Sequence, residues 1–497
     1  MGLPQYDELH VVSDLHMGGR PGFQILREGK RLAGFIDWVG QQRPTGRVAL
    51  VLNGDIIDSL AEDIGGYVAI ADAVAMVERI FAYDAFKPVW DALAAFVAKP
   101  LRTLIIVIGN HDIELAFPPV QRAVLARLAG DDLAARARIE FSTMGAGYPC
   151  VVGNASVFCT HGNEVDPWNY NRYEDLSRAA RRLNAGRTLD PSEWQPNAGT
   201  KMVKDVMNDV KRKYAWIDLL KPEAQAAVGV LLVLDPSQVA KINRLIPIIA
   251  EKVRGDQQVD QRLSADGFAT AVPAASSAPR ADRLLGPNLT QGMKVGSSAS
   301  GLGSDQLLLQ VEKTYQTRGP GANGGDETLG TGQFIWDRLT GWITGIGKDE
   351  ALRRALKDWL AGDKTFQVDA PDDTYKGVTE NTGADIDFIV TGHTHLERAI
   401  NRGGGRYYFN TGTWIRLLRF DDSVLASAAA FQPAYKVLID GTMKAIDDAV
   451  FGGKPFVMDQ SSAVRMTADN TGTAGELVHV TGDGTQFVPV GAPLRRS

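Results

Sequence analysis

Few features of this sequence are typical of secreted or membrane-embedded proteins. Only two cysteines occur among 497 residues, so no disulfide framework is indicated and a reducing compartment is expected. Residues 1–8 lack the basic and apolar regions of a secretory signal, and the most apolar run, residues 226–234, is too short to cross a bilayer. The net charge of -6 disfavours nonspecific coating of nucleic acid. We therefore expect a soluble, cytoplasmic protein, for which peripheral membrane contact stays open.

Short apolar runs alternate with helical patterns over the first 165 residues. Apolar side chains recur at helical spacing in residues 31–39 and in two segments within residues 68–97. This alternation predicts an α/β domain. Its expected strands are residues 9–12, 48–52, 104–108 and 138–141, followed by a hairpin at residues 150–159.

A long interruption separates this region from the next clear strand. We expect residues 1–165 and 384–497 to form one discontinuous core, and residues 166–383 to form a large, mostly helical insertion. Within the insertion, the composition shifts to Gly, Ser, Ala and Pro near residues 264–332, which is typical of a flexible segment. Further strands are expected at residues 388–390, 406–409, 434–439 and 477–480.

The turns that follow the core strands carry carboxylate, amide or imidazole side chains. In open α/β sheets, ligands bind beyond the carboxyl ends of the strands, so these side chains are expected to converge. Five of the seven histidines lie in such turns, whereas His10 and His479 lie within strands and are expected to be structural. The turn residues are Asp14, His16, Asp55, Asp58, Asn110, His111, His161, His393 and His395.

The types of these side chains indicate a metal site. Carboxylate, imidazole and amide oxygen together favour divalent ions such as Mn²⁺, Fe²⁺ or Zn²⁺. With one bridging carboxylate, two such ions lie roughly 3.5–4 Å apart, clamp a phosphoryl group and hold a hydroxide nucleophile between them. The pattern thus predicts a metal-dependent hydrolase of phosphate esters or anhydrides that needs no serine or cysteine nucleophile.

Five short motifs follow one another in a familiar order. Asp-x-His, Gly-Asp-x-x-Asp, Gly-Asn-His-Asp, His-Gly and Gly-His-x-His resemble those of the calcineurin-like metallophosphoesterases, over residues 8–165 and 384–416. The resemblance implies a sandwich of two β-sheets flanked by helices. Residues 13–16 and 161–166 look similar to those of bacterial UDP-2,3-diacylglucosamine pyrophosphatases. This chain differs from those enzymes in having His111 in place of an arginine and in its longer insertion.

The resemblance also implies a role for each turn residue. Two divalent ions are implied as cofactors, with manganese preferred and iron or zinc as alternatives. His111 would contact the phosphate and assist the leaving group, with Asp58 orienting it. Asp14, His16, Asp55 and His395 would bind one ion, and Asp55, as the bridge, would bind the other together with Asn110, His161 and His393.

Several of these residues also have simpler interpretations. Asp58 and Asp112 precede helical segments and could cap them, and for Asp112 we favour the cap. Arg178, Arg181 and Arg182 share a helix face that could bind an anionic substrate, although a solvated face is the favoured interpretation. The apolar residues 226–249 are expected to pack within the insertion rather than contact a membrane. Cys150 and Cys159 are expected to be buried small apolar residues.

Three functions remain in competition. The favoured one is hydrolysis of a phosphorylated small molecule or lipid precursor. A nuclease or nucleotide phosphodiesterase becomes the better hypothesis if the basic helices of the insertion line the site. A noncatalytic interaction module ranks last, because every expected ligand is present.

Overall fold

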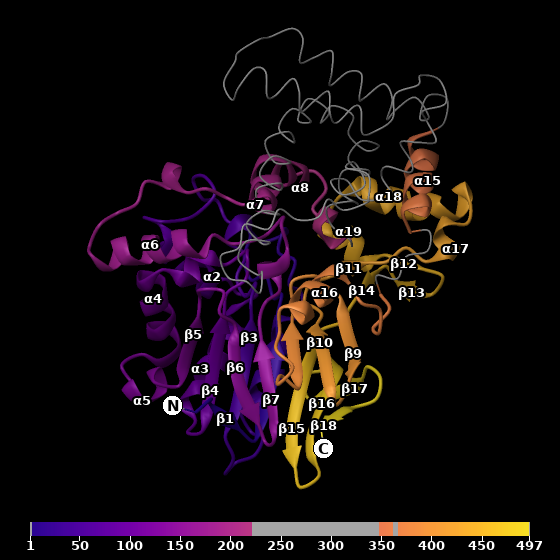
Figure 1. Ribbon diagram of the computed structural model, residues 1–497. Coiled ribbons are helices and arrows are strands. Elements are labelled where there is room, and N and C mark those ends of the chain that lie inside the picture. The colour runs from indigo at the N-terminus through magenta and orange to yellow at the C-terminus, as the bar shows by residue number, and fades with distance from the viewer. Residues whose placement is uncertain (1, 221–346, 361–365, 497) are drawn as a thin grey trace, which may run out of the picture.

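Two β-sheets form the centre of the computed structural model, which describes residues 2–220, 347–360 and 366–496 (Figure 1). In the larger sheet, four parallel strands follow one another in chain order, and β15 then pairs with β2 in the antiparallel direction. The strands run in the order β17 (Gln486–Pro489), β16 (Gly472–Thr481), β15 (Ser462–Asp469), β2 (Glu8–Val12), β3 (Val48–Asn53), β4 (Arg102–Val107) and β5 (Ile139–Ser142), with β18 (Leu494–Arg496) also paired to β16.

The smaller sheet joins segments from both sides of the insertion. Its central contact is the parallel pair of β7 and β8, in which Val157 lies opposite Phe388. The two strands are more than 220 residues apart in the sequence, so the insertion leaves and re-enters the sheet at adjacent strands. The order is β1 (Gln5–Tyr6), β6 (Tyr148–Val152), β7 (Ala155–Cys159), β8 (Phe388–Thr391), β10 (Arg406–Thr411) and β9 (Glu397–Gly403).

The space between the two sheets is filled by apolar side chains from both. Val11 and Val51 of the larger sheet belong to the same buried cluster as Val157 and Phe388 of the smaller one. A partly buried polar pair also joins the sheets, because His479 Nε2 of β16 lies 2.7 Å from Glu397 Oε1 of β9. The inward faces that alternate along each strand therefore hold the sandwich together. Cys150 and Cys159 are buried in this core as unpaired small residues, as expected.

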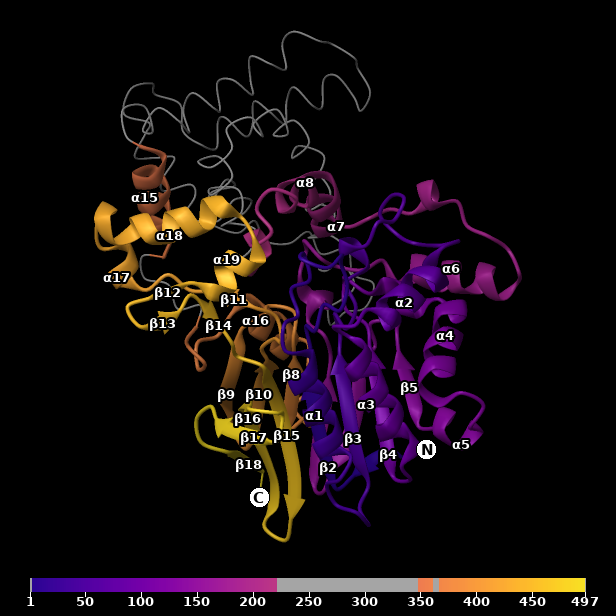
Figure 2. The same cartoon turned by 180° about the vertical axis from the view of Figure 1, so that it is seen from behind.

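Helices cover the outer faces of both sheets. The first helices lie over the outer face of the larger sheet (Figure 2). Their side chains Phe35 and Leu93 belong to the same buried cluster as Leu50 and Leu104 of that sheet. On the smaller sheet, Val378 of α16 (Asp373–Glu380) packs on Ile389 and Tyr408. The predicted α/β sandwich of two sheets flanked by helices is confirmed. The helices on the larger sheet and its edge are α1 (Gly29–Val39), α2 (Ala73–Ala82), α3 (Lys87–Ala98), α4 (Pro118–Ala129), α5 (Leu133–Arg136) and α6 (Tyr173–Asn184).

A smaller apolar core lies beside the sandwich. It joins Trp216 and Leu219, at the end of the described residues 2–220, to Leu352 of the described residues 347–360 and to Phe431 and Leu438. Residues 417–458 thus pack with described parts of the insertion and do not extend the larger or the smaller sheet. The elements here are α15 (Lys348–Leu360), α17 (Asp422–Leu425), α18 (Ala428–Asp440), α19 (Met443–Asp448) and the strand pairs β11 (Leu417–Leu418) with β14 (Val457–Met458) and β12 (Val450–Phe451) with β13 (Lys454–Pro455).

The prediction of a strand at residues 434–439 is wrong, because these residues lie within α18. The helix begins after Ser427, whose hydroxyl accepts a hydrogen bond from the backbone N–H of Ala430, and it ends at Gly441, with a φ of 74°. Its buried side chains, Phe431, Ala434 and Leu438, recur at helical spacing. Capping at both ends and this buried stripe outweigh the strand preference of the short apolar run.

The described parts of the insertion are helical. α7 (Ala198–Met202), a π-helical turn (Val203–Met207) and α8 (Asn208–Lys211) form one continuous helical segment. The expected flexible segment at residues 264–332 and the apolar residues 226–249 lie outside the described residues. Within the ranges that the structure describes, no helix is long and apolar enough to span a bilayer. Short 3-10 turns occur at Ser59–Ala61, Ile113–Ala116, Asn163–Val165, Pro191–Glu193 and Ile217–Leu219.

Candidate metal centre

The predicted ligands come together where the central strands of both sheets end. Asp14 and His16 follow β2, and Asp55 follows β3 after the tight turn at Gly54. The corresponding loops after β4, β7 and β8 supply the other side chains. All of them are buried except for two that are partly exposed, His111 and His393. The loops carry Asn110 and His111 after β4, His161 after β7, and His393 and His395 after β8.

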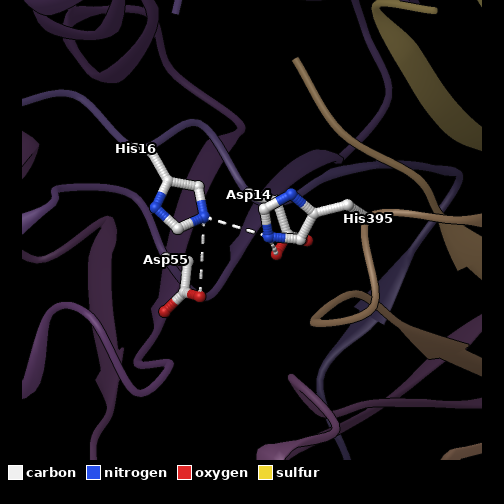
Figure 3. Close-up of side chains that lie close together, drawn as sticks. All are labelled: Asp14, His16, Asp55 and His395. Carbon is white, nitrogen blue, oxygen red and sulfur yellow. Dashed lines mark hydrogen bonds and ion pairs between the residues drawn. The ribbon is translucent and has the colours of Figure 1, made fainter. Parts of the chain in front are cut away.

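One cluster consists of Asp14, His16, Asp55 and His395, each of which places one ligand atom within 4.8 Å of the others (Figure 3). His395 Nε2 lies 3.3 Å from Asp14 Oδ1 and 3.2 Å from His16 Nε2. His16 Nε2 is also 3.7 Å from Asp55 Oδ2. Two carboxylates and two imidazoles therefore face a common point, as a divalent cation requires.

A second cluster contains Asp55, His161 and His393. His161 Nε2 lies 3.2 Å from Asp55 Oδ2, the same oxygen that faces His16 in the first cluster. The other oxygen of Asp55 accepts a hydrogen bond from the backbone N–H of His111 at 2.9 Å. Asp55 is thus the carboxylate common to both clusters.

Two oxygen atoms test whether these clusters suit metal ions. Asp14 Oδ1 and Asn110 Oδ1 are buried, and neither accepts a hydrogen bond from any described residue, although Asp14 Oδ1 faces His395 Nε2 at 3.3 Å. Leaving a buried oxygen without a hydrogen bond costs about 1–3 kcal/mol, which coordination of a cation would offset. The oxygen and imidazole ligands present here fit a pair of divalent ions.

The charges of the centre are strongly coupled. Burial raises the pKa of Asp14, and the neighbouring Asp55 carboxylate raises it further. Burial disfavours the charged form of His161, but Asp55 and Asp14 outweigh it and raise the pKa of His161 to about 10. Protonated His161 therefore balances the buried carboxylates in the metal-free protein. A bound cation would take over this balancing charge.

The backbone of the ligand loops adopts an unusual conformation. Asp14, His16 and Asp55 have φ values of 54°, 47° and 52°, and those of His393 and His395 are 73° and 60°. These five are among the eight described non-glycine residues with positive φ. Each such conformation costs on the order of 1–3 kcal/mol and persists only where the surrounding structure enforces it. The fold thus stores strain in the loops that form the two clusters.

Asp58 makes both of the contacts considered for it. Its Oδ1 atom accepts a hydrogen bond from the backbone N–H of Ala61 at 3.1 Å, which caps the short turn that follows. The same oxygen lies 3.1 Å from His111 Nδ1, and Oδ2 lies 3.6 Å from His16 Nδ1. Burial alone would raise the pKa of Asp58, but His111 and His16 hold it well below the usual value. Asp58 is therefore an anion that orients His111.

Asp112 has a different role from the expected helix cap. Its side chain makes no capping hydrogen bond to the turn that follows it. Instead, its two oxygens accept hydrogen bonds from the backbone N–H groups of Gly109 at 2.6 Å and Ile56 at 2.7 Å. Burial and the charge of Asp55 raise the pKa of Asp112 to about 7. This carboxyl group ties together the loops after β3 and β4.

Asp166 is a neighbour of the centre whose role the sequence did not indicate. Its Oδ2 atom lies 2.8 Å from His393 Nε2. An imidazole that donates from Nε2 can bind a cation only through Nδ1, so this contact selects the tautomer and fixes the ring. Burial raises the pKa of Asp166, but the hydrogen bond from His393 outweighs this and keeps the carboxylate ionised.

The substitution Asp166→Asn is expected to weaken binding at the second cluster by about 10–100-fold, because the His393 ring loses its anionic acceptor. Competition for Mn²⁺ against a fluorescent chelator would measure the two affinities separately, and binding at the first cluster should change little. Thermal unfolding of the metal-free variant controls for damage to the fold. Two unchanged Mn²⁺ affinities would contradict this role.

The three arginines proposed to bind substrate are not brought to the centre. Arg178 is 77% exposed on α6 and pairs with Asp175 at 3.1 Å. Arg182 pairs with Glu193 at 2.8 Å, and Arg181 is exposed on the same helix. Within the described ranges, no hydrogen bond or ion pair links them to the Asp–His clusters. Their role in substrate binding stays a prediction. Their surroundings are those of a solvent-exposed helix face.

Two stacked sheets with buried Asp–His clusters at the strand ends define the metallophosphoesterase class of fold. Residues 9–214 match the family model of the calcineurin-like phosphoesterases. A search of curated proteins found no match to the chain. The match ends before His393 and His395, but the pairing of β8 with β7 brings them to the same centre. Family and clusters together support a metal-dependent phosphoesterase with a dinuclear site for divalent ions.

Proposed function

We propose that this protein hydrolyses a phosphate ester or anhydride of a small molecule or lipid precursor, using two divalent ions held by its Asp–His clusters. The observation that carries the proposal is the position of Asp55, whose Oδ2 atom faces imidazoles of both clusters. Such a shared carboxylate holds two cations close enough to act on one phosphoryl group. Manganese is the preferred ion, with iron or zinc as alternatives.

The first ion would be held by Asp14, His16, Asp55 and His395, and the second by Asp55, Asn110, His161 and His393. When bound, the ions supply a nucleophile near neutral pH and stabilise the charge that develops on the phosphoryl oxygens. The protein's own side chains would hold this pair at the ends of the central strands. The oxygen of water forms a bond to phosphorus, the bond from phosphorus to the leaving group breaks, and the leaving oxygen takes up a proton.

His111 is the residue that would supply this proton. Its Nδ1 atom lies 3.1 Å from the ionised Asp58, so Nε2 would be the ring atom that transfers the proton. The ring is packed edge-on against that of His16, with centroids 4.7 Å apart. His111 would therefore be positioned on the leaving-group side of the first cluster.

The nuclease alternative depended on basic helices that line the site. The exposed arginines of α6 do not support it, so we retain the small-molecule or lipid-precursor substrate. The interaction module has no support either, because the cluster residues are all present. A cytoplasmic location, with peripheral membrane contact open, completes the proposal.

A panel of substrates tests this function directly. The protein is stripped with a chelator, reloaded with Mn²⁺, Fe²⁺ or Zn²⁺, and assayed on phosphomonoesters, phosphodiesters and nucleoside diphosphates. We expect hydrolysis of at least one class, its loss on chelation and its return with metal. If no class is hydrolysed with any ion, the proposal is wrong.

The substitution His111→Ala is expected to lower turnover by about 10²–10⁴-fold for esters of aliphatic alcohols, because their leaving oxygen needs a proton. For p-nitrophenyl esters the loss should be much smaller, since p-nitrophenolate departs without protonation. Turnover across a series of leaving groups of graded basicity measures this difference. Asp58→Asn should give the same trend with a smaller amplitude. An equal loss on every leaving group would contradict the acid role of His111.

A further inference from the structure

The peptide unit that joins Gly392 to His393 is held at both of its polar ends. Its N–H group donates a hydrogen bond to Asp14 Oδ2 at 3.0 Å. Its carbonyl oxygen accepts a hydrogen bond from Asn410 Nδ2 at 2.7 Å. These two partners come from different sheets, since Asp14 follows β2 and Asn410 lies near the end of β10. The plane of this peptide is therefore fixed, and with it the backbone direction that leads into His393.

Asn410 also contacts the residue between the two histidines. Its Nδ2 atom donates a second hydrogen bond, to Thr394 Oγ1 at 3.1 Å. Because a carbonyl oxygen can only accept, the amide nitrogen of Asn410 must face Gly392, and its two hydrogens serve Gly392 and Thr394. The Oδ1 atom accepts a hydrogen bond from the backbone N–H of Gly412 at 3.0 Å. The Asn410 side chain is thus fully buried, with a partner for each polar atom.

The register of the smaller sheet brings Asn410 to this position. β10 runs parallel to β8, and Asn410 lies opposite Thr391, two residues before His393. The side chain can therefore reach the His-Thr-His turn, which is residues 393–395, directly after β8. Both strands lie outside residues 9–214, so the family match does not extend to Asn410.

The backbone of the His-Thr-His turn is strained and requires such contacts. His393 and His395 have φ values of 73° and 60°, and each costs on the order of 1–3 kcal/mol unless neighbouring groups enforce it. His395 belongs to the first cluster and His393 to the second. A relaxed turn would therefore move one imidazole out of each cluster. An ion that must first order the turn binds more weakly, because the ordering costs free energy.

We propose that Asn410 is a positioning residue for both metal ions, which holds the His-Thr-His turn in its binding conformation before any ion arrives. This inference rests on the two-ion centre of the proposed function. Asp166 differs from Asn410, because it contacts the ring of His393, which belongs to the second cluster only. Loss of the Asn410 contacts therefore weakens both ions, whereas Asp166→Asn weakens one.

Asn410→Ser tests the proposal in the full-length protein. The shorter hydroxyl group can still accept from the Gly412 N–H, but it no longer reaches Gly392 and Thr394. Competition against a fluorescent chelator should show Mn²⁺ binding weakened by about 10–100-fold at both clusters. The visible absorption spectrum of bound Co²⁺ should change as well, since it reports the geometry of the ligands.

Asn401→Ser is the matched control. Asn401 Oδ1 accepts the same local hydrogen bond, from the backbone N–H of Gly403 at 2.9 Å, but this residue is exposed on β9. Asn401→Ser should therefore keep both Mn²⁺ affinities and the Co²⁺ spectrum of the wild type.

Variants of Thr394 test the second contact separately. Thr394→Val removes one of the two acceptors on the turn and should weaken Mn²⁺ binding about three- to tenfold at both clusters. Thr394→Ser keeps the hydroxyl group and should restore each affinity to within about twofold of the wild type. The double variant Asn410→Ser/Thr394→Val should bind Mn²⁺ as Asn410→Ser does, because both changes remove the same contact.

Three results would overturn this inference. One is a loss of affinity at a single cluster in Asn410→Ser. Another is a lowered melting temperature of metal-free Asn410→Ser with unchanged Mn²⁺ affinities, which would assign Asn410 a structural role. The third is a failure of Thr394→Ser to recover the loss seen in Thr394→Val.

Metal affinity and hydrolysis separate this inference from the proposed function. If the wild type binds two Mn²⁺ ions but hydrolyses no substrate of the panel, the proposed function fails, and the affinities of the variants still decide the role of Asn410. If the wild type binds fewer than two Mn²⁺ ions, both proposals are overturned.

Discussion

Asp55→Ala is expected to abolish metal-dependent turnover on every substrate, with a loss of at least about 1,000-fold. The reason is that one carboxylate serves both clusters. Asp55 Oδ2 faces His16 at 3.7 Å and His161 at 3.2 Å, so its removal deprives each cluster of an anion at once. We expect the number of tightly bound Mn²⁺ ions to fall from two to at most one. Elemental analysis of the purified variant and steady-state kinetics would measure the two effects.

The control for this substitution is Asp84→Ala, which removes an exposed carboxylate far from the clusters in sequence. Asp84→Ala should retain the turnover and metal content of the wild type. Full activity of Asp55→Ala on every substrate would show that the two-metal mechanism is wrong. Loss of activity with two ions still bound would instead place the effect of Asp55 in the chemical step.

Gly109→Ala is expected to disrupt the centre from the loop after β4. A methyl group at this position would overlap with Asp55 Oδ1 and lie 2.6 Å from the backbone nitrogen of Asp55. Because that nitrogen belongs to the main chain, the loop of the shared carboxylate must shift. A displacement of about 1 Å in a catalytic group lowers turnover roughly 100-fold. The crowding should also destabilise the fold by about 1–3 kcal/mol.

Gly65→Ala is the matched control, since a methyl group there meets no atom within 4 Å. Chemical denaturation gives the stability of each variant, and kinetics at saturating Mn²⁺ gives turnover. We expect Gly65→Ala to match the wild type in both. If Gly109→Ala retained normal turnover, close packing of Gly109 against Asp55 would be irrelevant to the centre.

The positions of the ligand loops could be predicted from the sequence because each follows a short, buried strand. The apolar run at residues 104–108, for example, is followed by Gly109-Asn110-His111, and Gly and Asn favour a turn at that point. The fold class follows from the same alternation. The loops come together because the carboxyl ends of parallel strands lie at the same edge of a sheet. The positions of the ligand loops could therefore be predicted from local sequence patterns.

The contacts around the ligands could not be predicted, because they join distant parts of the chain. Asp166 and His393 are 227 positions apart, and nothing near either residue indicates the other. The sequence around Asp112 is that of a helix cap, but its partners are backbone N–H groups that β3 and β4 bring to it. Each of these roles depends on tertiary structure.

The pairing of β15 with β2 has a consequence for the order in which the protein is made. β2 carries the loop of Asp14, and its antiparallel neighbour is translated more than 440 residues later. Domains usually begin to fold during synthesis, which lengthens the chain by about 5–20 residues per second. A nascent chain that ends before β15 therefore exposes one edge of β2, and one that ends before β8 also lacks His393 and His395. Neither cluster can have all of its residues until His393 and His395 have been translated, so we expect metal loading to follow synthesis of most of the chain.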